Sequence, residues 1–570
     1  MLYKNLFLFI LTACFVCICP QNGLSLHSFS TPVLTAFLLS GLIHYLPNPL
    51  QKIMGLVLGE TVMAICIVDC YCQIYLGSSI TPQIFTTILL TNAHETQEFL
   101  STFINGDVIF QWRIISLLML AILFPVSIFT KWQLPMPESK MWKNVYLILL
   151  AISIVFEIPA TYRYAQLFRQ QKNLKNVEGL IFRHDHEALP TPLHRLAFAY
   201  YASNLSADVL NDIEHRTFEA KVDSCSYRSP HIVLIIGESY NKHHASLYGY
   251  HLPTTPLQQH RVANGELFPY TDIVTSWNIT SNVFLDVFSL WEHGQKAPIT
   301  DYPLFPVLFR RAGYSVTFFS NQYLLKGFRK GATNQASHFF LASKTLSDSL
   351  FSYRNQKSAR YDMGIVGQIA DYKSQKQSRQ PYTLDIIHLI GQHFDYAARY
   401  PRSQTEFSMK DYVDRSISNE AKEIVMHYDN ATQYNDMVLD RLLSLYSQED
   451  AIAVFLADHG EEVYDDLPVH GRLFQEPTAI QAQQEFEVPM WIWCSDTYRN
   501  NHPEVIAFIK NSLHKPFMTD GIPQILLWLS GIKCRWTDET RNLLSPHYQC
   551  KKRIIASTAD YDYLMQSMGR

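Results

Sequence analysis

Apolar and polar positions divide the chain into two parts with different patterns. Before about residue 162, apolar residues form five long segments, at residues 3–20, 31–46, 53–76, 114–129 and 145–160. Each segment approaches the roughly 20 apolar residues that a helix needs to cross a bilayer core. The pattern therefore predicts a helical membrane domain of five spans in residues 1–162.

After about residue 229 the pattern changes to short apolar runs that alternate with amphipathic stretches. The runs are typical of strands buried on both faces, and they fall at residues 232–236, 315–319, 383–388, 451–457 and 488–493. The amphipathic stretches indicate helices at residues 303–312, 361–372, 419–447 and 502–514. This alternation predicts an α/β/α domain in residues 229–570, with a mainly parallel sheet between layers of helices. Residues 163–228 are expected to form bridging or interfacial helices between the two domains.

Positive charges between the apolar segments set the orientation of the predicted membrane domain. They are Lys4, Lys52, Lys131, Lys140 and Lys143. By contrast, the loops at residues 21–30 and 77–112 contain no Lys or Arg. The positive-inside rule therefore places these loops, and everything after residue 162, on the outer side of the membrane. Apolar residues recur at helical spacing in the loop near residues 77–113, which we expect to lie along the outer membrane surface.

Composition limits the partners and the covalent links of the outer domain. The chain is 48% hydrophobic and 17% charged, with a formal net charge of -4. No block of Lys or Arg indicates a nucleic-acid partner. Four cysteines lie after the membrane part: Cys225, Cys494, Cys534 and Cys550. In an exported domain Cys534 and Cys550 could close a disulfide loop, and four free thiols are the alternative.

Polar or ionisable residues follow four of the predicted strands. They are Glu238, Asn321 with Gln322, His393, and Asp458 with His459. Open α/β sheets bind their ligands beyond the carboxyl ends of their strands. We therefore expect these side chains to meet at one edge of the sheet.

The Asp458-His459-Gly460-Glu461 stretch, together with Glu238, predicts a metal site. Two carboxylates and one imidazole suit a zinc-like cation, and one coordination position is left for a reacting oxygen. His393 and His470 lie in later loops. Their imidazoles could bind a second metal, contact a phosphate oxygen or protonate a leaving group, although a surface position is the simpler interpretation of either one alone.

A hydroxyl-rich segment before residues 283–291, which have a helix-like pattern, offers a nucleophile. The candidates are Thr275, Ser276, Thr280 and Ser281. A metal can lower the pKa of a hydroxyl at this position, and a helix N-terminus favours an incoming phosphate. A simple helix N-cap is the alternative interpretation.

Several motifs in order along nearly the whole chain carry a family resemblance. They are GESYNKHHASLYGYHLPTTP, HLIGQHFDYAARYP, HYDNATQYND, LADHGEE and VHG, with TNAHETQEF in the outer loop. The set resembles the phosphoethanolamine transferases of Gram-negative envelopes, in the sulfatase and alkaline-phosphatase superfamily. The resemblance implies an alkaline-phosphatase-like fold and an inner-membrane enzyme with a periplasmic catalytic domain. It implies transfer of phosphoethanolamine from phosphatidylethanolamine to a lipopolysaccharide acceptor, through a phosphothreonine and one or two zinc ions.

The resemblance also implies roles for individual residues. Glu238, Asp458 and His459 match the zinc ligands, and Thr280 matches the nucleophile that completes the zinc site. His393 and His470 match histidines that contact the phosphate or a second zinc. Asn92 and Glu95 match outer-loop residues at the donor-lipid site. We expect Asn321 to contribute to substrate binding.

The nucleophile and the acceptor remain open at this point. When the segment is matched to the family's motif by counting back from Phe288, the nucleophile falls on Thr280. When the match is made by counting forward from Val274, the nucleophile falls on Ser281. We prefer Thr280 because the family uses threonine. Relatives that modify lipid A commonly have a disulfide around the nucleophile, but this chain has Trp277 and Asp286 there and no cysteine. The acceptor is therefore a core heptose, lipid A or a periplasmic glucan.

Three rival functions are consistent with parts of the pattern. The first is a phosphoglycerol transferase of the lipoteichoic-acid-synthase type, and the second is a sulfatase-like phosphohydrolase that uses water as the acceptor. The third is a membrane scaffold without catalytic activity. The joint presence of Glu238, Thr280, Asp458 and His459 argues against the scaffold.

Overall fold

The structure is a computed structural model, and it divides the chain into two compact units. The described residues are 46–76, 79–81, 110–129, 191–322, 343–375, 380–473, 476–556 and 558–569, with isolated positions between 31 and 166. One unit comprises Met1–Leu205 and Leu473–Gln475, and the other comprises Ser206–Arg472 and Glu476–Arg570. The second unit contains the predicted α/β domain.

Two apolar helices are described in the first unit: α3 (Asn48–Tyr75) and α7 (Trp112–Phe129). They coincide with the predicted segments 53–76 and 114–129, and they pack through Val62 and Leu117. In the part of the chain that the structure describes, α3 alone is long and apolar enough to cross a membrane. The other three predicted segments lie almost wholly outside the described residues, so the count of five spans stays a prediction.

A buried ion pair joins α3 to the start of α10 (Pro192–Glu219). Arg195 donates to Asp69 through Nη2 at 2.6 Å and through Nε at 3.0 Å. The backbone N–H of Ile80 donates to the same carboxylate at 2.9 Å. Because a buried charge is stable only when it is paired and hydrogen-bonded, this pair fixes the beginning of α10 against α3. The apolar pattern of the chain gave no indication of it.

A seven-stranded sheet forms the centre of the second unit. Its strand order is β3-β11-β8-β2-β7-β5-β6. The strands are β2 (His231–Gly237), β3 (Leu267–Tyr270), β5 (Ser315–Ser320), β6 (Tyr353–Arg354), β7 (Thr383–His388), β8 (Ala451–Ala457) and β11 (Met490–Cys494). All five predicted strands are present, and the mainly parallel sheet is confirmed.

The direction of β11 differs from the parallel alternation that the sequence pattern suggests. β11 runs antiparallel to both β8 and β3. After β8, the chain stays at the carboxyl edge of the sheet and forms β9 (Glu462–Val463) and β10 (His470–Gly471). It then re-enters the sheet from that same edge, with Met490 opposite Leu456. A strand that enters where its neighbour ended must run antiparallel to it.

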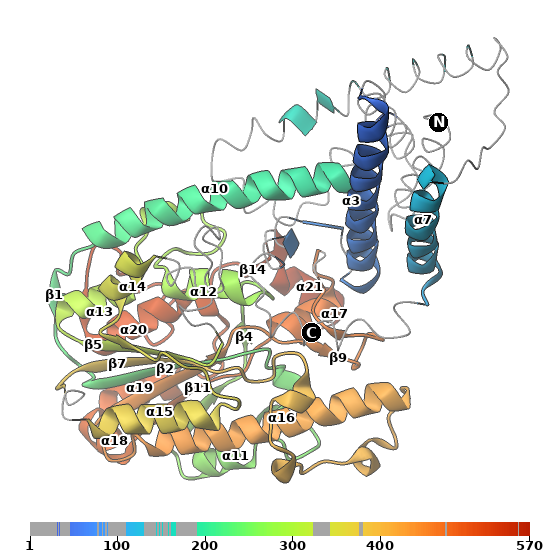
Figure 1. Ribbon diagram of the computed structural model, residues 1–570. Helices are drawn as coiled ribbons and strands as arrows, with labels where there is room; N and C mark the ends of the chain where they lie inside the picture. The colour runs from blue at the N-terminus through green and yellow to red at the C-terminus, as the bar shows by residue number, and fades with distance from the viewer. Residues whose placement is uncertain are drawn as a thin grey trace. The chain divides into compact units, whose positions relative to one another are not determined.

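Helices cover both faces of the sheet, as the fully buried strands require. Figure 1 shows one layer of helices on one face, namely α12 (Thr280–Phe288), α13 (Pro306–Ala312), α14 (Lys344–Leu350) and α20 (Ile522–Ser530). Figure 1 shows another layer on the opposite face, with α11 (Pro256–Ala263), α15 (Met363–Ser374) and α16 (Asn419–Ser444). The predicted helices are thus confirmed, with ends that differ by a few residues.

Smaller elements complete the second unit. The short helices are α17 (Ala479–Gln481), α18 (Asp496–Asn501), α19 (Pro503–Lys510) and α21 (Tyr561–Ser567). Three further sheets each consist of two strands of two residues. They pair β1 (Ser224–Cys225) with β13 (Ile532–Lys533), β4 (Ile273–Val274) with β12 (Phe517–Met518), and β14 (Ile554–Ile555) with β15 (Ala559–Asp560). The four cysteines of this unit form no disulfide, so of the two alternatives left open by the sequence the structure has the four free thiols.

A buried histidine with two carboxylate partners ties the GESYNKHH segment to the rest of the unit. His244 Nδ1 lies 2.6 Å from Asp429 on α16, and Nε2 lies 2.8 Å from Asp465 in the loop after β9. Arg415 donates to the other oxygen of Asp465 at 2.8 Å. Burial alone would lower the pKa of His244, but the two carboxylates outweigh burial and raise it to about 10.

We expect His244→Gln to lower the free energy of unfolding by about 3 kcal/mol, because it leaves buried carboxylates without their cation. The ordinary pKa of 6.5 is raised to about 10 in the folded state. The stabilisation by the imidazolium is therefore complete below pH 6.5 and is lost as the pH rises towards 10. Thermal melting of the purified chain at several pH values measures both effects. His502→Gln, which removes an imidazole that pairs with Asp450, is the matched control; equal melting of the two variants would contradict the prediction.

Candidate metal centre

The register of the parallel strands brings the candidate residues to one edge of the sheet. Gly237 on β2 pairs with Ala457 on β8. Glu238 and Asp458 are the next residues of these two strands, so they leave the sheet side by side. On the other side of β2, Ile236 pairs with His388 of β7, and His388 pairs with Ser320 of β5. The strand ends therefore converge, as the sequence pattern predicts.

Glu238, Asp458 and His459 form a compact cluster of possible metal ligands. One ligand atom from each lies within 4.8 Å of the others. His459 Nε2 is 3.3 Å from Glu238 Oε1 and 3.2 Å from Asp458 Oδ2. All three side chains are fully buried. We call these three residues the acidic triad.

Backbone geometry holds the acidic triad in place. Ser239 has a φ of 54°, a left-handed conformation that is uncommon for a residue other than glycine. In this conformation its backbone N–H donates to Asp458 Oδ1 at 3.0 Å, and its hydroxyl donates to Glu238 Oε1 at 2.8 Å. A Cβ at Gly460 would lie 2.3 Å from the carbonyl oxygen of Gln484. Gly460 is therefore required for close packing of the Asp-His-Gly turn against residues 482–486.

Hydrogen bonds fix the tautomer of His459. Its Nδ1 lies 2.8 Å from the carbonyl oxygen of Gly460, which can only accept, so Nδ1 carries the proton. Arg472 Nη1 donates to Nε2 at 2.9 Å, which places the Nε2 lone pair within the cluster. Burial and the nearby Arg472 lower the pKa of His459. The imidazole is therefore neutral at pH 7, as a metal ligand must be.

Among the candidate nucleophiles, Thr280 contacts the acidic triad. Its Oγ1 is 3.3 Å from Glu238 Oε2 and 3.3 Å from His459 Nε2. Thr280 is the first residue of α12, so its hydroxyl lies at the positive end of that helix. Ser281, the alternative, donates to Asn282 at 3.4 Å. The geometry therefore favours Thr280 over Ser281.

A polar clamp, formed by Ser276, Asp286 and His293, surrounds the segment that carries Thr280. Ser276 Oγ donates to Asp286 on α12 at 2.7 Å. The same carboxylate oxygen lies 3.0 Å from His293 Nδ1, beyond the end of the helix. Asp286 is only 2% exposed. This region contains no cysteine, and the buried carboxylate of Asp286 links its two ends instead.

The two carboxylates of the acidic triad have pKa values that diverge. Burial raises the pKa of Asp458, and the negative charge of Glu238 raises it further. Burial also opposes ionisation of Glu238, but the neighbouring imidazoles of His388 and His459 outweigh burial and hold its pKa well below the usual value. Gln322 Nε2 also donates to Glu238 Oε2 at 2.7 Å. Two adjacent buried carboxylates resist joint ionisation unless a cation is present.

The acidic triad fits a divalent metal ion by both geometry and hydrogen bonding. Asp458 Oδ2 is buried and has no hydrogen-bond partner, although buried polar atoms nearly always have one. Bonds of about 2 Å in a tetrahedral site separate ligand atoms by about 3.3 Å. The contacts of His459 Nε2 with Glu238, Asp458 and Thr280 are 3.2 to 3.3 Å long. One nitrogen and two carboxylate oxygens match the ligands that zinc prefers.

The two predicted histidines lie in different surroundings. Burial lowers the pKa of His393 to about 3, although the negative charge of Glu238 opposes this shift. His470 Nδ1 is 3.2 Å from the hydroxyl of Tyr464, and its ring is 6.1 Å from that of Tyr396. Burial lowers its pKa to about 4. Both imidazoles are therefore neutral at pH 7.

The structure places Asn321 in a supporting position. Its amide donates to Asp362 at 2.9 Å and accepts from the backbone N–H of Ala359 at 2.6 Å. The adjacent Gln322, by contrast, contacts Glu238. The substrate-binding role of Asn321 is therefore still a prediction. Asn92 and Glu95 lie outside the described residues.

Three contacts of the acidic triad were not assigned a role from the sequence. Gln322 was predicted at a strand end together with Asn321, and it does reach Glu238, but no role was assigned to it. His388 ends a buried strand and lies 3.7 Å from Glu238 Oε2, but its sequence context resembles an ordinary core position. Arg472 follows the VHG motif directly, and no spacing rule indicated that it would reach His459.

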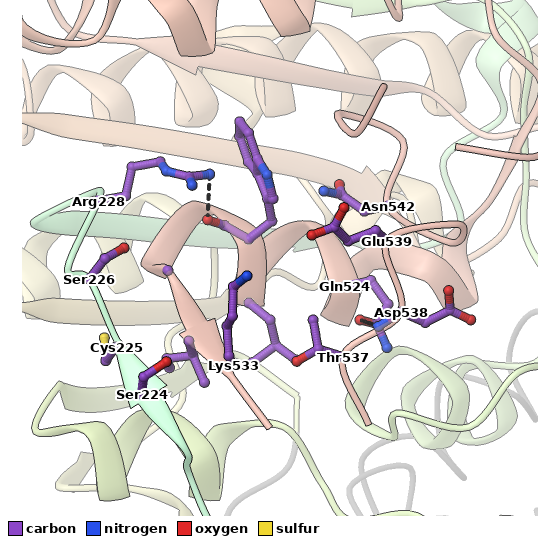
Figure 2. Close-up of a pocket in the computed structure, with 14 residues that line it drawn as sticks. Ser224, Cys225, Ser226, Arg228, Gln524, Lys533, Thr537, Asp538, Glu539 and Asn542 are labelled. Atoms are coloured by element: carbon purple, nitrogen blue, oxygen red, sulfur yellow. Dashed lines mark hydrogen bonds between the residues drawn. The ribbon is translucent and has the colours of Figure 1, made fainter. Parts of the chain in front are cut away.

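A cavity of about 180 Å³ lies between β1, β13 and α20. The Arg228 guanidinium lies 4.1 Å from the centroid of the Trp528 ring. Figure 2 shows Arg228, Lys533 and Asp538 in the lining. Arg228 precedes β2, whereas Glu238 follows it, so the cavity lies towards the amino end of β2, away from the acidic triad. Its lining contains none of the acidic triad residues, nor Thr280. It therefore does not form part of the candidate metal centre.

The chain is similar to known phosphoethanolamine transferases, one of which has been solved with zinc. The chain is 24% identical over 528 residues to phosphoethanolamine transferase EptC of Escherichia coli strain K12, covering 90% of this chain and 87% of that protein. The periplasmic domain of Escherichia coli EptC, solved in complex with zinc, matches at 25% identity with a TM-score of 0.52, over 61% of this chain and 96% of that one. The integral membrane lipooligosaccharide phosphoethanolamine transferase EptA of Neisseria meningitidis matches at 18% identity with a TM-score of 0.59, over 94% and 96%. This last match shows a common fold.

A family model fixes the wider relationship. The model described as Sulfatase matches residues 230–531, which is more than half of the 570 residues. The matched region contains the acidic triad, Thr280 and Arg472. The chain therefore belongs to the sulfatase family, and its curated relatives are phosphoethanolamine transferases.

Proposed function

We propose that the protein transfers phosphoethanolamine from phosphatidylethanolamine to a lipopolysaccharide acceptor, through a phosphothreonine at Thr280. The observation that carries the proposal is the position of Thr280 Oγ1, at 3.3 Å from both Glu238 and His459 at the start of α12. The names of the relatives support the reaction type, and that of the Neisseria protein supports a lipooligosaccharide-like acceptor. The apolar helix α3 supports a place in the membrane, where the donor lipid lies.

The residues present suit zinc as the cofactor, whether one ion or two. Glu238, Asp458 and His459 would hold it together with Thr280. Bound zinc supplies a Lewis acid that lowers the pKa of the Thr280 hydroxyl and offsets the negative charge of a phosphoryl group. The zinc complex of the related Escherichia coli domain supports this choice.

The first chemical step forms a bond between Thr280 Oγ1 and phosphorus. The bond from phosphorus to the diacylglycerol oxygen breaks, and the proton of Thr280 ends on that oxygen. Glu238 accepts the hydrogen bond of the Thr280 hydroxyl and so orients a lone pair of Oγ1. His393 or His470 relays the proton, since neutral imidazole can both accept and donate one. The N-terminus of α12 favours the negative charge of the phosphoryl group.

In the second step, a hydroxyl or phosphate of the acceptor displaces Thr280 from phosphorus. The acceptor proton returns to Thr280, and the products are diacylglycerol and the modified acceptor. Two in-line displacements retain the configuration at phosphorus.

We assign the enzyme to the bacterial inner membrane as a multi-pass protein with a periplasmic catalytic domain. The acceptor that receives the phosphoethanolamine is a core heptose, lipid A or a periplasmic glucan.

Thr280→Ala is expected to reduce transfer by at least about a hundredfold, because it removes the covalent nucleophile. Mass spectrometry of envelope glycolipids from cells with and without the protein measures the transfer and identifies the acceptor. The same method, applied to protein quenched during turnover, should locate phosphoethanolamine on the peptide that contains Thr280.

Ser281→Ala is the matched control for the nucleophile and should retain transfer. Undiminished transfer by Thr280→Ala, or a modified peptide that carries the group on Ser281, would contradict the assignment. Release of free phosphoethanolamine with no modified glycolipid would instead support the phosphohydrolase alternative.

Asp458→Asn is expected to weaken zinc binding by about a hundredfold or more. Loss of a group that only orients a metal ligand typically costs 10–100-fold in affinity, and Asp458 is placed to bind the ion directly. Competition with a fluorescent chelator measures the affinity without any need for activity. Asp538→Asn, in the cavity beside β13 and α20, is the control and should bind zinc like the parent. Unchanged affinity of Asp458→Asn would remove Asp458 from the ligand set.

A further inference from the structure

Arg472 connects the acidic triad to the segment that carries Thr280. Its Nη1 donates to His459 Nε2 at 2.9 Å and to the backbone carbonyl of Asn278 at 3.2 Å. Asn278 lies two residues before Thr280, so the guanidinium lies beside the turn that presents the nucleophile. The Arg472 side chain is 15% exposed. It is therefore mostly enclosed in the site and still reachable from solvent.

Glu461 holds the guanidinium from the other side. Its Oε1 is 3.6 Å from Arg472 Nε, and its Oε2 accepts a hydrogen bond from Tyr396 at 2.5 Å. Glu461 is only 1% exposed. This contact fixes the Nε side of the guanidinium and leaves Nη1 directed towards His459 and Asn278.

The contact between Arg472 and His459 uses the lone pair that a metal ion would need. An imidazole nitrogen has one lone pair, so His459 Nε2 cannot accept from Arg472 and bind a cation at the same time. Metal binding must therefore release the Nη1–H group from His459. Glu461 does not compete for the ion, so it can retain the guanidinium beside the site.

A released guanidinium N–H beside a metal site suits an anionic oxygen. Guanidinium groups bind phosphate oxygens through two N–H donors in a planar arrangement. Among the described residues, Arg472 is the one Lys or Arg that hydrogen-bonds to or pairs with any member of the acidic triad. Of the cations that the structure describes, it is thus well placed to neutralise a phosphoryl group at Thr280.

We propose that Arg472 binds the phosphoryl group during transfer, and that metal binding frees it to do so by displacing it from His459. The identity of the phosphoryl group rests on the function proposed above. The exchange at His459 Nε2 rests on the geometry alone. Arg472 then acts as a catalytic residue that contacts two oxygens of the transferred group while Thr280 attacks.

The first test measures zinc affinity in the metal-free full-length protein by chelator competition. Arg472→Gln should bind zinc roughly tenfold more tightly than the parent, since a charged hydrogen bond of the kind it removes contributes about 1.5–3 kcal/mol. Arg499→Gln is the matched control. Arg499 lies on α18, after the antiparallel strand β11, and donates to Asp496, so its loss should leave zinc affinity unchanged. Zinc affinity equal to or below that of the parent in Arg472→Gln would overturn the exchange.

The second test measures binding of inorganic phosphate to the zinc-loaded protein by calorimetry. Arg472→Gln should bind phosphate at least about tenfold more weakly, because it loses a charged group that can donate two hydrogen bonds to the phosphate. Arg472→Lys keeps the positive charge but lacks the planar guanidinium, so we expect it to bind phosphate with an intermediate affinity. If Arg472→Gln fails to fold in a melting experiment, the comparison of Arg472→Lys with the parent decides. Parent-like phosphate affinity in the folded variants would overturn the proposal.

These measurements separate this inference from the proposed reaction. If the parent binds phosphate through Arg472 but transfers no phosphoethanolamine to any envelope glycolipid, the proposed function fails and the role of Arg472 stands. If transfer is observed and phosphate affinity is independent of Arg472, the proposed function stands and the role of Arg472 fails.

Discussion

The parallel pairing of β2 with β8 is the constraint on which the site depends. Because Gly237 lies opposite Ala457, the next residues of the two strands, Glu238 and Asp458, leave the sheet together. The hydrogen-bonded ladder of two fully buried strands therefore holds two carboxylates close to each other. Such an arrangement is unfavourable for charged groups alone, because each carboxylate raises the free energy of ionising the other. A divalent cation converts the repulsion into a binding site, and the unpaired Asp458 Oδ2 marks where it is needed.

The remaining features of the site follow from the need to present a hydroxyl and a phosphoryl group to that position. The start of α12 brings Thr280 to the acidic triad, and the polar clamp around Asp286 joins both flanks of the helix. Ser239 adopts a left-handed backbone conformation so that its N–H and hydroxyl reach one carboxylate each. Backbone strain of this kind persists where the surrounding structure enforces it. The strain thus lies at the point where the two carboxylates are oriented.

Much of this architecture could be predicted from the sequence, and the reasons are physical. Strands buried on both faces give unbroken apolar runs, so all five predicted strands were found. A polar residue after such a run must lie at a strand end, so Glu238, Asp458 and His459 could be placed at one edge. The direction of β11 could not be inferred, since an apolar run has the same pattern in either direction. The ion pair of Asp69 with Arg195 and the contact of Arg472 with His459 were not predicted either. The first joins residues far apart in the chain, and the second joins residues across a loop. In neither case does a fixed sequence spacing indicate the contact.

The antiparallel return of β11 explains where the unpredicted residues lie. Because the chain does not cross the sheet between β8 and β11, residues 458–472, which follow β8, remain at the carboxyl edge. This one excursion supplies Asp458, His459, Glu461, His470 and Arg472 to the site. A parallel crossover would have carried the chain away from that edge after Glu461, and it would have required another segment to provide the guanidinium. The direction of one strand, which the apolar pattern left undetermined, therefore decides that the metal ligands and the cation beside them come from a single loop.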